Sequence, residues 1–155
     1  MSKRLFLVLF GVIVFFIQGC ANEDTSRDFS NNHNNITQIS AKNTYDQTIS
    51  NEAKQTLSKK ENITKVVAAN TDKILIIGIE IPHHERFGLQ KMNKKLSKEM
   101  DDKFKDTDIR VELVTDKKII IELEKIENKL RTNDMTKKEL EKKLKHISKL
   151  LKEQT

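Results

Sequence analysis

The stretch Lys73-Ile74-Leu75-Ile76-Ile77-Gly78-Ile79-Glu80-Ile81 decides the fold of this chain. Successive side chains of a strand point to opposite faces of a sheet, so this stretch predicts a strand with one face that is apolar throughout. That face carries Leu75 and every second residue up to Ile81, and other elements must cover it. Pro82 has no amide hydrogen to donate and ends the strand. Gly78 is expected to mark a bulge or a close packing contact.

Upstream of this strand the sequence predicts one helix and one further strand. Residues Tyr45, Ile49, Ala53 and Leu57 recur at the four-residue spacing of one helix face, and we expect this helix to end near Lys60. Residues 63–69 are typical of a strand. The turn-forming residues 70–72 separate that strand from the central one.

Downstream of the central strand the pattern predicts helix, strand and helix. Apolar residues at three- and four-residue spacing over 89–104 indicate an amphipathic helix of about four turns. Apolar and charged residues then alternate over 109–113, which is typical of a strand with one buried and one wet face. Asp116 can cap a helix that continues to Leu130. The β-branched run 119–121 could extend the sheet instead, but the continued helical spacing favours helix.

This order of elements over residues 45–131 predicts an α+β fold. Helices would lie on one apolar face of a small antiparallel sheet, which makes a sandwich of two layers. We therefore expect a compact domain over residues 44–132.

The N-terminal segment is typical of an export signal. Lys3 and Arg4 precede thirteen uncharged residues, 5–17, which as a helix would span roughly 20 Å, short of the ~30 Å hydrocarbon core of a bilayer. Ile17-Gln18-Gly19-Cys20 resembles a bacterial lipobox, which implies cleavage between Gly19 and Cys20 and diacylation of Cys20. The alternatives are an uncleaved anchor or an ordinary signal peptide with an incidental cysteine.

A polar segment follows the predicted cleavage site. Residues 1–19 would form the signal peptide, and residues 20–43 the lipidated cysteine and a flexible tether, because their asparagine-rich composition cannot bury enough apolar surface to order itself. Loss of residues 1–19 would lower the formal net charge from +6 to +4. Cys20 is the only cysteine, so no disulfide can form within the chain.

Residues 133–155 predict a separate basic amphipathic helix. Thr136 and Glu139 have the spacing of a capping box. We take the lysines of this helix as candidate residues for surface or partner binding: Lys137, Lys138, Lys142, Lys143, Lys145 and Lys149. The helix could bind anionic lipid, a wall polymer or a partner helix. Equally, its leucines could pack on the domain or pair as a short coiled coil.

Residue chemistry favours a binding protein over an enzyme. His83, His84 and Glu85 form the one cluster that suggests a metal, but a closed zinc site needs four ligands, and we expect a solvated loop and no metal or cofactor. No Ser, Cys or Thr stands in a recognisable nucleophile, base and orienting group arrangement, so we expect neither catalysis nor a small-molecule substrate. Aromatic residues are scarce, which argues against nucleic-acid binding.

The features that carry a family resemblance are the leader, the polar spacer, the stretch 73–81, the helix 89–104 and the stretch Asp108-Ile109-Arg110-Val111-Glu112-Leu113-Val114-Thr115-Asp116. Together they resemble the YhcN/YlaJ-type sporulation lipoproteins of endospore-forming bacteria. The resemblance covers roughly residues 45–130 and implies a lipoprotein that is exported and anchored to the outer face of a cell or spore membrane. It also implies a role in spore formation or germination among spore-envelope proteins. The order of elements is similar to that of BON-like envelope domains, an analogy of fold only. The alternative is a general cell-surface lipoprotein whose basic C-terminal helix is the functional part.

Overall fold

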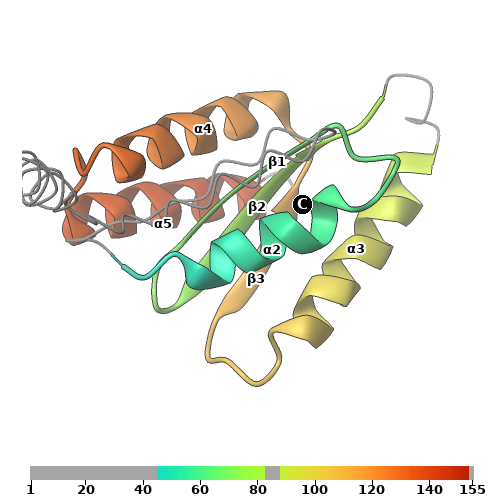
Figure 1. The fold of residues 1–155 in the computed structure, drawn as a ribbon, viewed down its shortest axis with the longest axis horizontal. Coiled ribbons are helices and arrows are strands. Elements are labelled where there is room, and N and C mark those ends of the chain that lie inside the picture. The colour runs from blue at the N-terminus through green and yellow to red at the C-terminus, as the bar shows by residue number, and fades with distance from the viewer. Residues whose placement is uncertain (1–44, 83–87, 154–155) are drawn as a thin grey trace, which may run out of the picture. The chain divides into compact units, whose positions relative to one another are not determined.

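The computed structural model describes residues 45–82 and 88–153, and these residues form the predicted α+β domain with its additional C-terminal helix (Figure 1). The predicted signal peptide (1–19), the tether (20–43) and Cys20 lie outside the described residues. The helix expected to end near Lys60 ends at Ser58. The elements in chain order are α2 (Thr48–Ser58), β1 (Lys65–Asn70), β2 (Ile74–Glu80), α3 (Leu89–Lys103), β3 (Arg110–Val114), α4 (Lys117–Arg131) and α5 (Lys137–Glu153).

The sheet has the strand order β1-β2-β3, with the central stretch in the middle. β1 and β2 form an antiparallel pair in which Val67 lies opposite Gly78. β2 and β3 are parallel, with Ile76 opposite Glu112, so the expectation of a wholly antiparallel sheet is wrong at this pairing. The reason is α3, which supplies the long crossover connection that parallel neighbours require.

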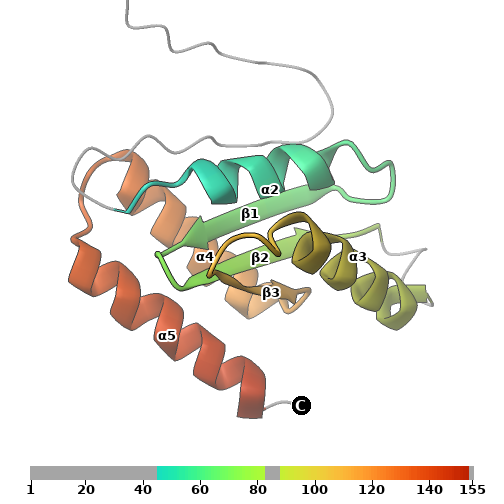
Figure 2. The ribbon, with the colours of Figure 1, turned by 90° about the horizontal axis from the view of Figure 1, so that it is seen from below.

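Helices cover both faces of the sheet, whereas the sequence pattern predicts them on one (Figure 2). Alternate residues of β1 and β2 belong to two separate hydrophobic clusters. Ala68 and Leu75 belong to the cluster that contains residues of α2 and α3, and Ala69 and Ile76 to the cluster that contains residues of α4 and α5. Six of the seven β2 residues are buried, which is typical of a strand covered on both sides.

Gly78 marks a close packing contact, one of the two roles expected for it. A Cβ atom at this position would lie 2.9 Å from both Ile120 Cγ1 and Val67 Cγ2, and 3.2 Å from Leu123 Cδ1. Because β2 lacks a side chain here, α4 can pack directly against the strand.

Local capping explains where α4 and α5 begin. The Asp116 carboxylate accepts hydrogen bonds from the backbone N–H groups of Lys118 (2.8 Å) and Ile119 (3.1 Å), as predicted. The run 119–121 is therefore helical. Thr136 and Glu139 form the predicted capping box, with the Thr136 N–H donating to Glu139 Oε2 at 2.9 Å and the Glu139 N–H to Thr136 Oγ1 at 3.3 Å.

Candidate binding surface

α5 packs on the domain through its apolar residues. Leu140 and Leu144 are fully buried and Ile147 is 4% exposed, and all three belong to the cluster on the α4 side of the sheet. Leu151 packs against the same cluster. The sequence left open whether the leucines of α5 pack on the domain or pair as a coiled coil, and in the structure they pack on the domain. Most of the apolar face of α5 is therefore occupied by the domain, and Leu150 remains half-buried.

The six candidate lysines of α5 are all exposed. Lys138, Lys142, Lys145 and Lys149 recur every three or four residues on the side of the helix opposite to the buried leucines, because such spacings return to one face. We call these four residues the lysine ridge. Lys149 lies 3.7 Å from Glu153, and both side chains remain largely in solvent. The other two candidates flank the ridge: Lys137 and Lys143.

Lys137 connects the start of α5 to the start of the described domain. Its ammonium lies 5.1 Å from the centroid of the Tyr45 ring, a cation–π arrangement. The Tyr45 hydroxyl donates a hydrogen bond to Glu141, and this bond, with some burial, raises the pKa of Tyr45 to about 12. Lys137 is thus partly engaged within the chain.

A groove of about 490 Å³ runs between α4 and α5. Its floor includes Ile119, Ile126 and Leu150, and its rim carries charges of both signs. His146 also lines it. No local sequence pattern indicates this groove, because it depends on how the two helices pack.

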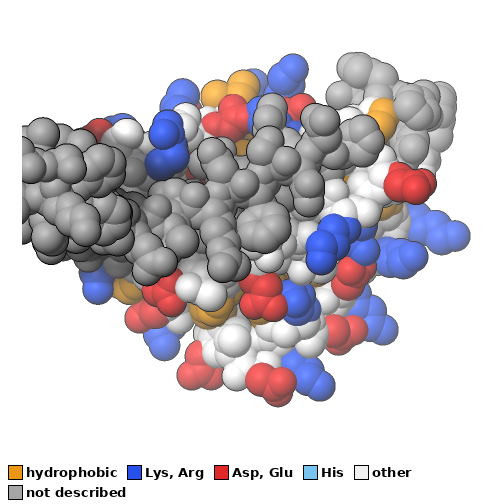
Figure 3. All heavy atoms as spheres, in the orientation of Figure 1, with side chains coloured by type: hydrophobic (Ala, Val, Ile, Leu, Met, Phe, Trp, Pro, Cys, Tyr) orange, Lys and Arg blue, Asp and Glu red, His pale blue; other side chains and the backbone are white. Residues whose placement is uncertain are grey.

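Charges of both signs also alternate on the face of the molecule visible in Figure 3, where blue and red side chains are interspersed over the described part. The lysine ridge of α5 differs from this mixed pattern, because residues Lys137–Glu153 hold seven lysines and three glutamates. Within the described residues, α5 is therefore a concentrated source of positive charge.

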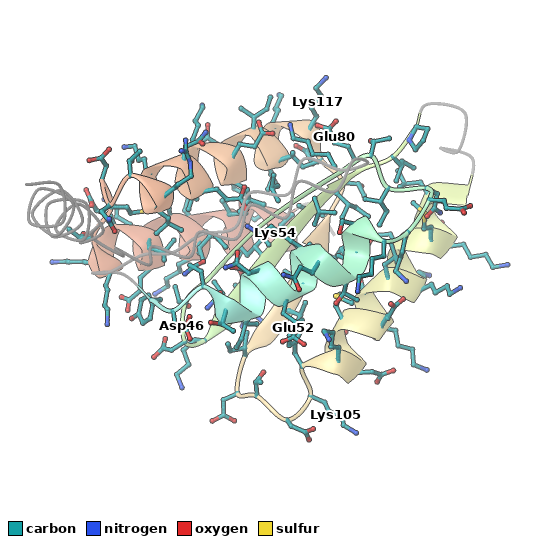
Figure 4. All side chains as sticks on the ribbon, viewed as in Figure 1. Asp46, Glu52, Lys54, Glu80, Lys105 and Lys117 are labelled. Atoms are coloured by element: carbon teal, nitrogen blue, oxygen red, sulfur yellow. The ribbon has the colours of Figure 1, made fainter. Side chains whose placement is uncertain are left out.

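A buried ion pair, which no local sequence pattern predicts, joins α2 to α4. Lys54 is fully buried, and its Nζ lies 2.8 Å from Glu127 Oε1. Figure 4 shows Lys54 on the side of α2 toward the strands, whereas Glu52 leaves the helix on another side. Burial lowers the pKa of Lys54 and raises the pKa of Glu127, because the charged forms lose their hydration.

This pair closes the outer edge of β1. Glu127 Oε1 also accepts a hydrogen bond from the Ala68 N–H at 3.0 Å. Beside it the Gln47 amide donates to the Asn70 carbonyl at 2.8 Å and accepts from the Asn70 N–H at 3.1 Å. Perturbed charges can mark a catalytic site, but here Glu127 accepts from one backbone group of the edge strand, and Gln47 bonds to two others.

A smaller polar cluster lies between β3 and α5. Ser148 is buried, and its hydroxyl donates to Glu112 Oε1 at 2.7 Å. Arg110 lies close to the same carboxylate, with its Nε 3.1 Å from Glu112 Oε1. The second carboxylate oxygen, Glu112 Oε2, is buried and has no hydrogen-bond partner among the described residues. The wet strand face expected from the alternation of charges is thus partly covered by α5.

Several residues singled out in the sequence lie outside the described part of the chain: Gly19, Cys20, His83, His84 and Glu85. Within residues 45–82 and 88–153, no group of three or more His, Cys, Asp or Glu side chains is arranged to hold a metal ion. The helices of these same segments are also too short or too polar to cross a membrane.

Comparisons with known proteins add no relative to this picture. A scan against protein-family models, a search of curated proteins and a search of solved structures each found no match to this chain.

Proposed function

We propose that this protein is a lipid-anchored, non-enzymatic component of the spore envelope that acts in spore formation or germination by binding a surface or another protein. The lipobox-like residues 17–20 and the family resemblance over residues 45–130 support the anchor and the setting. The lysine ridge of α5 is the observation that carries the binding function.

The ridge suits an anionic surface that the domain touches without inserting into it. Leu140, Leu144 and Ile147 are buried in the domain, so the exposed side of α5 that faces an outside partner is the lysine ridge. A lysine near an anionic membrane surface contributes about 1 kcal/mol, so the four ridge residues together would strengthen binding by roughly a thousandfold. Such binding weakens with salt, because the Debye length falls to about 8 Å at physiological ionic strength.

A vesicle experiment tests the ridge. The chain from residue 20, with Cys20→Ala to remove the anchor, is mixed with vesicles of anionic phospholipid and sedimented. Changing the four ridge lysines to Gln should abolish most of the binding. A matched control changes four exposed lysines of α3 to Gln: Lys91, Lys94, Lys95 and Lys98. An equal loss of vesicle binding in both variants would mean that binding depends only on net charge, and this would contradict a specific role for α5.

The anchor and the setting are tested in cells of the source organism. The full chain should sediment with membranes, and Cys20→Ala should release it from them. A Cys20→Ala variant that stays bound and unprocessed would contradict the lipid anchor. An immunoblot of growing cells and purified spores should find the protein only in spores. Equal abundance in growing cells would contradict the sporulation role and leave the general cell-surface lipoprotein, in which the ridge alone carries the function.

A further inference from the structure

The two edge strands of the sheet, β1 and β3, differ in whether side chains bond to their outer backbone groups. The β1 edge is closed by the side chains of Gln47 and Glu127, which bond to backbone groups of Asn70 and Ala68. The β3 edge has no corresponding cover among the described residues. An uncovered edge strand is a template for another strand, and natural proteins usually block it unless it is used.

The register of β3 shows which backbone groups are available. The Arg110 N–H donates to the Lys73 carbonyl at 3.0 Å, so Arg110 and Glu112 direct their backbone groups toward β2. By the alternation of a strand, the N–H and C=O groups of Val111 and Leu113 point away from the sheet. Both side chains are half-buried, so the strand is reachable from outside.

We propose that this free edge pairs antiparallel with β3 of a second copy, with Val111 on the two-fold axis, so that two sheets become one. In this register Arg110 of each copy lies opposite Glu112 of the other, and Ile109 lies opposite Leu113. Opposite charges at directly facing positions stabilise a strand pair, and like charges destabilise it. A shift of the axis by one residue would place Glu112 against Glu112 or Arg110 against Arg110, so charge selects the register.

The surroundings of β3 are consistent with this partner. Arg110 lies 3.1 Å from Glu112 of its own strand, but 57% of its side chain remains exposed and can also face a neighbour. Glu112 has 16% of its side chain exposed, and in the pair the guanidinium of Arg110 from the second copy would lie beside this exposed part. A groove of about 420 Å³ lies between α3 and β3 and is lined by Leu113 and Ser97. Ile109 of the second copy would enter this groove next to Leu113.

Cysteine cross-linking in cells that produce the full chain tests the pairing directly. Facing residues of an antiparallel pair have Cα atoms about 5.5 Å apart, within the usual disulfide range. Val111→Cys should therefore form a disulfide-linked dimer. The control is Ile121→Cys, on the exposed side of α4, and the unchanged chain shows the background from Cys20. Cross-linking of Val111→Cys no greater than that of Ile121→Cys would overturn the proposal.

Charge exchange tests the register. Two differently tagged full-length copies are produced together and co-purified in mild detergent. Glu112→Arg or Arg110→Glu should each abolish co-purification, and the double variant Arg110→Glu/Glu112→Arg should restore it. Val111→Pro should also abolish it without unfolding the domain, because the lost N–H does not bond to β2. A monomeric chain that dimerises only after deletion of residues 21–43 would mean that the tether occupies the edge, and this would refute the proposal.

The pairing is independent of the proposed function, since it requires neither the lysine ridge nor the lipid anchor. If the ridge variant loses vesicle binding but still cross-links through Val111→Cys, strand pairing and surface binding are independent properties.

Discussion

Replacing Lys54 with Met should destabilise the domain strongly and in a pH-dependent way. The substitution keeps an unbranched side chain in the buried position but leaves Glu127 without its cation. Removing one partner of a buried ion pair typically costs about 3–5 kcal/mol. For a domain of this size each kcal/mol lowers the melting temperature by about 4–8 °C, so Lys54→Met should lower it by more than about 12 °C at pH 7.

The pH dependence follows from the pKa of Glu127, which burial raises and the charge of Lys54 lowers. The variant removes Lys54, so the pKa of Glu127 rises further. The folded state then binds a proton that the unfolded state releases, so stability falls as pH rises between the ordinary value of 4.5 and the raised pKa. On lowering the pH through that window, Lys54→Met should regain stability relative to the unchanged chain by up to about 1.4 kcal/mol per pH unit. Urea unfolding followed by circular dichroism at several pH values measures both effects.

Two further variants sharpen this experiment. In Lys54→Met/Glu127→Gln the glutamine oxygen can still accept from the Ala68 N–H, so most of the lost stability should return. Lys125→Met removes an exposed lysine that pairs with Glu122 on the same helix, and it should cost at most about 1 kcal/mol. The reasoning is refuted if Lys54→Met is as stable as the unchanged chain at pH 7, or if its loss does not shrink on acidification.

Three other predictions test packing, capping and the Tyr45 contact. Gly78→Ala should cost about 1–3 kcal/mol in urea unfolding because its Cβ would overlap neighbouring side chains, whereas Gly88→Ala, with nothing within 4 Å, should have little effect. Asp116→Ala should lower the free energy of unfolding by about 1 kcal/mol, and Asp116→Asn should retain most of it, since the amide oxygen still caps α4. Tyr45 is the only tyrosine, so ultraviolet absorbance reads its ionisation alone; the midpoint should lie at about 12 and move toward 10.0 in Glu141→Gln.

Local signals in the sequence were sufficient for the elements and their caps. The spacing around Leu140 and the Asp116 cap depend on residues a few positions apart, and both were predicted correctly. The parallel pairing of β3 and the second helix layer were not, because both depend on where α3 and α4 cross the sheet. A strand that is apolar at nearly every position, such as β2, is typical of a sheet covered on both faces. Ile74 and Ile76 lie on the second face and indicate that it is also covered.

Part of the binding surface could likewise be predicted from the sequence, and part required the fold. The candidate lysines could be identified from composition, and the burial of the leucines beside them required the fold. The Lys54–Glu127 pair joins residues 73 positions apart, and nothing near Lys54 in the sequence distinguishes it from the solvated lysines. The open edge of β3 likewise became visible only once the order of the strands was known.

The side-chain closure of β1 has a consequence for how the protein ages in solution. Val66, Val67, Ala68 and Ala69 form a short apolar strand whose outer edge is closed only while α2 and α4 stay docked. Local opening of α2 would expose that edge long before the whole domain unfolds. The resulting species could exchange strands between molecules or seed fibrils. Removing the hydrogen bonds between Gln47 and the Asn70 backbone should therefore speed aggregation of the protein more than its global unfolding.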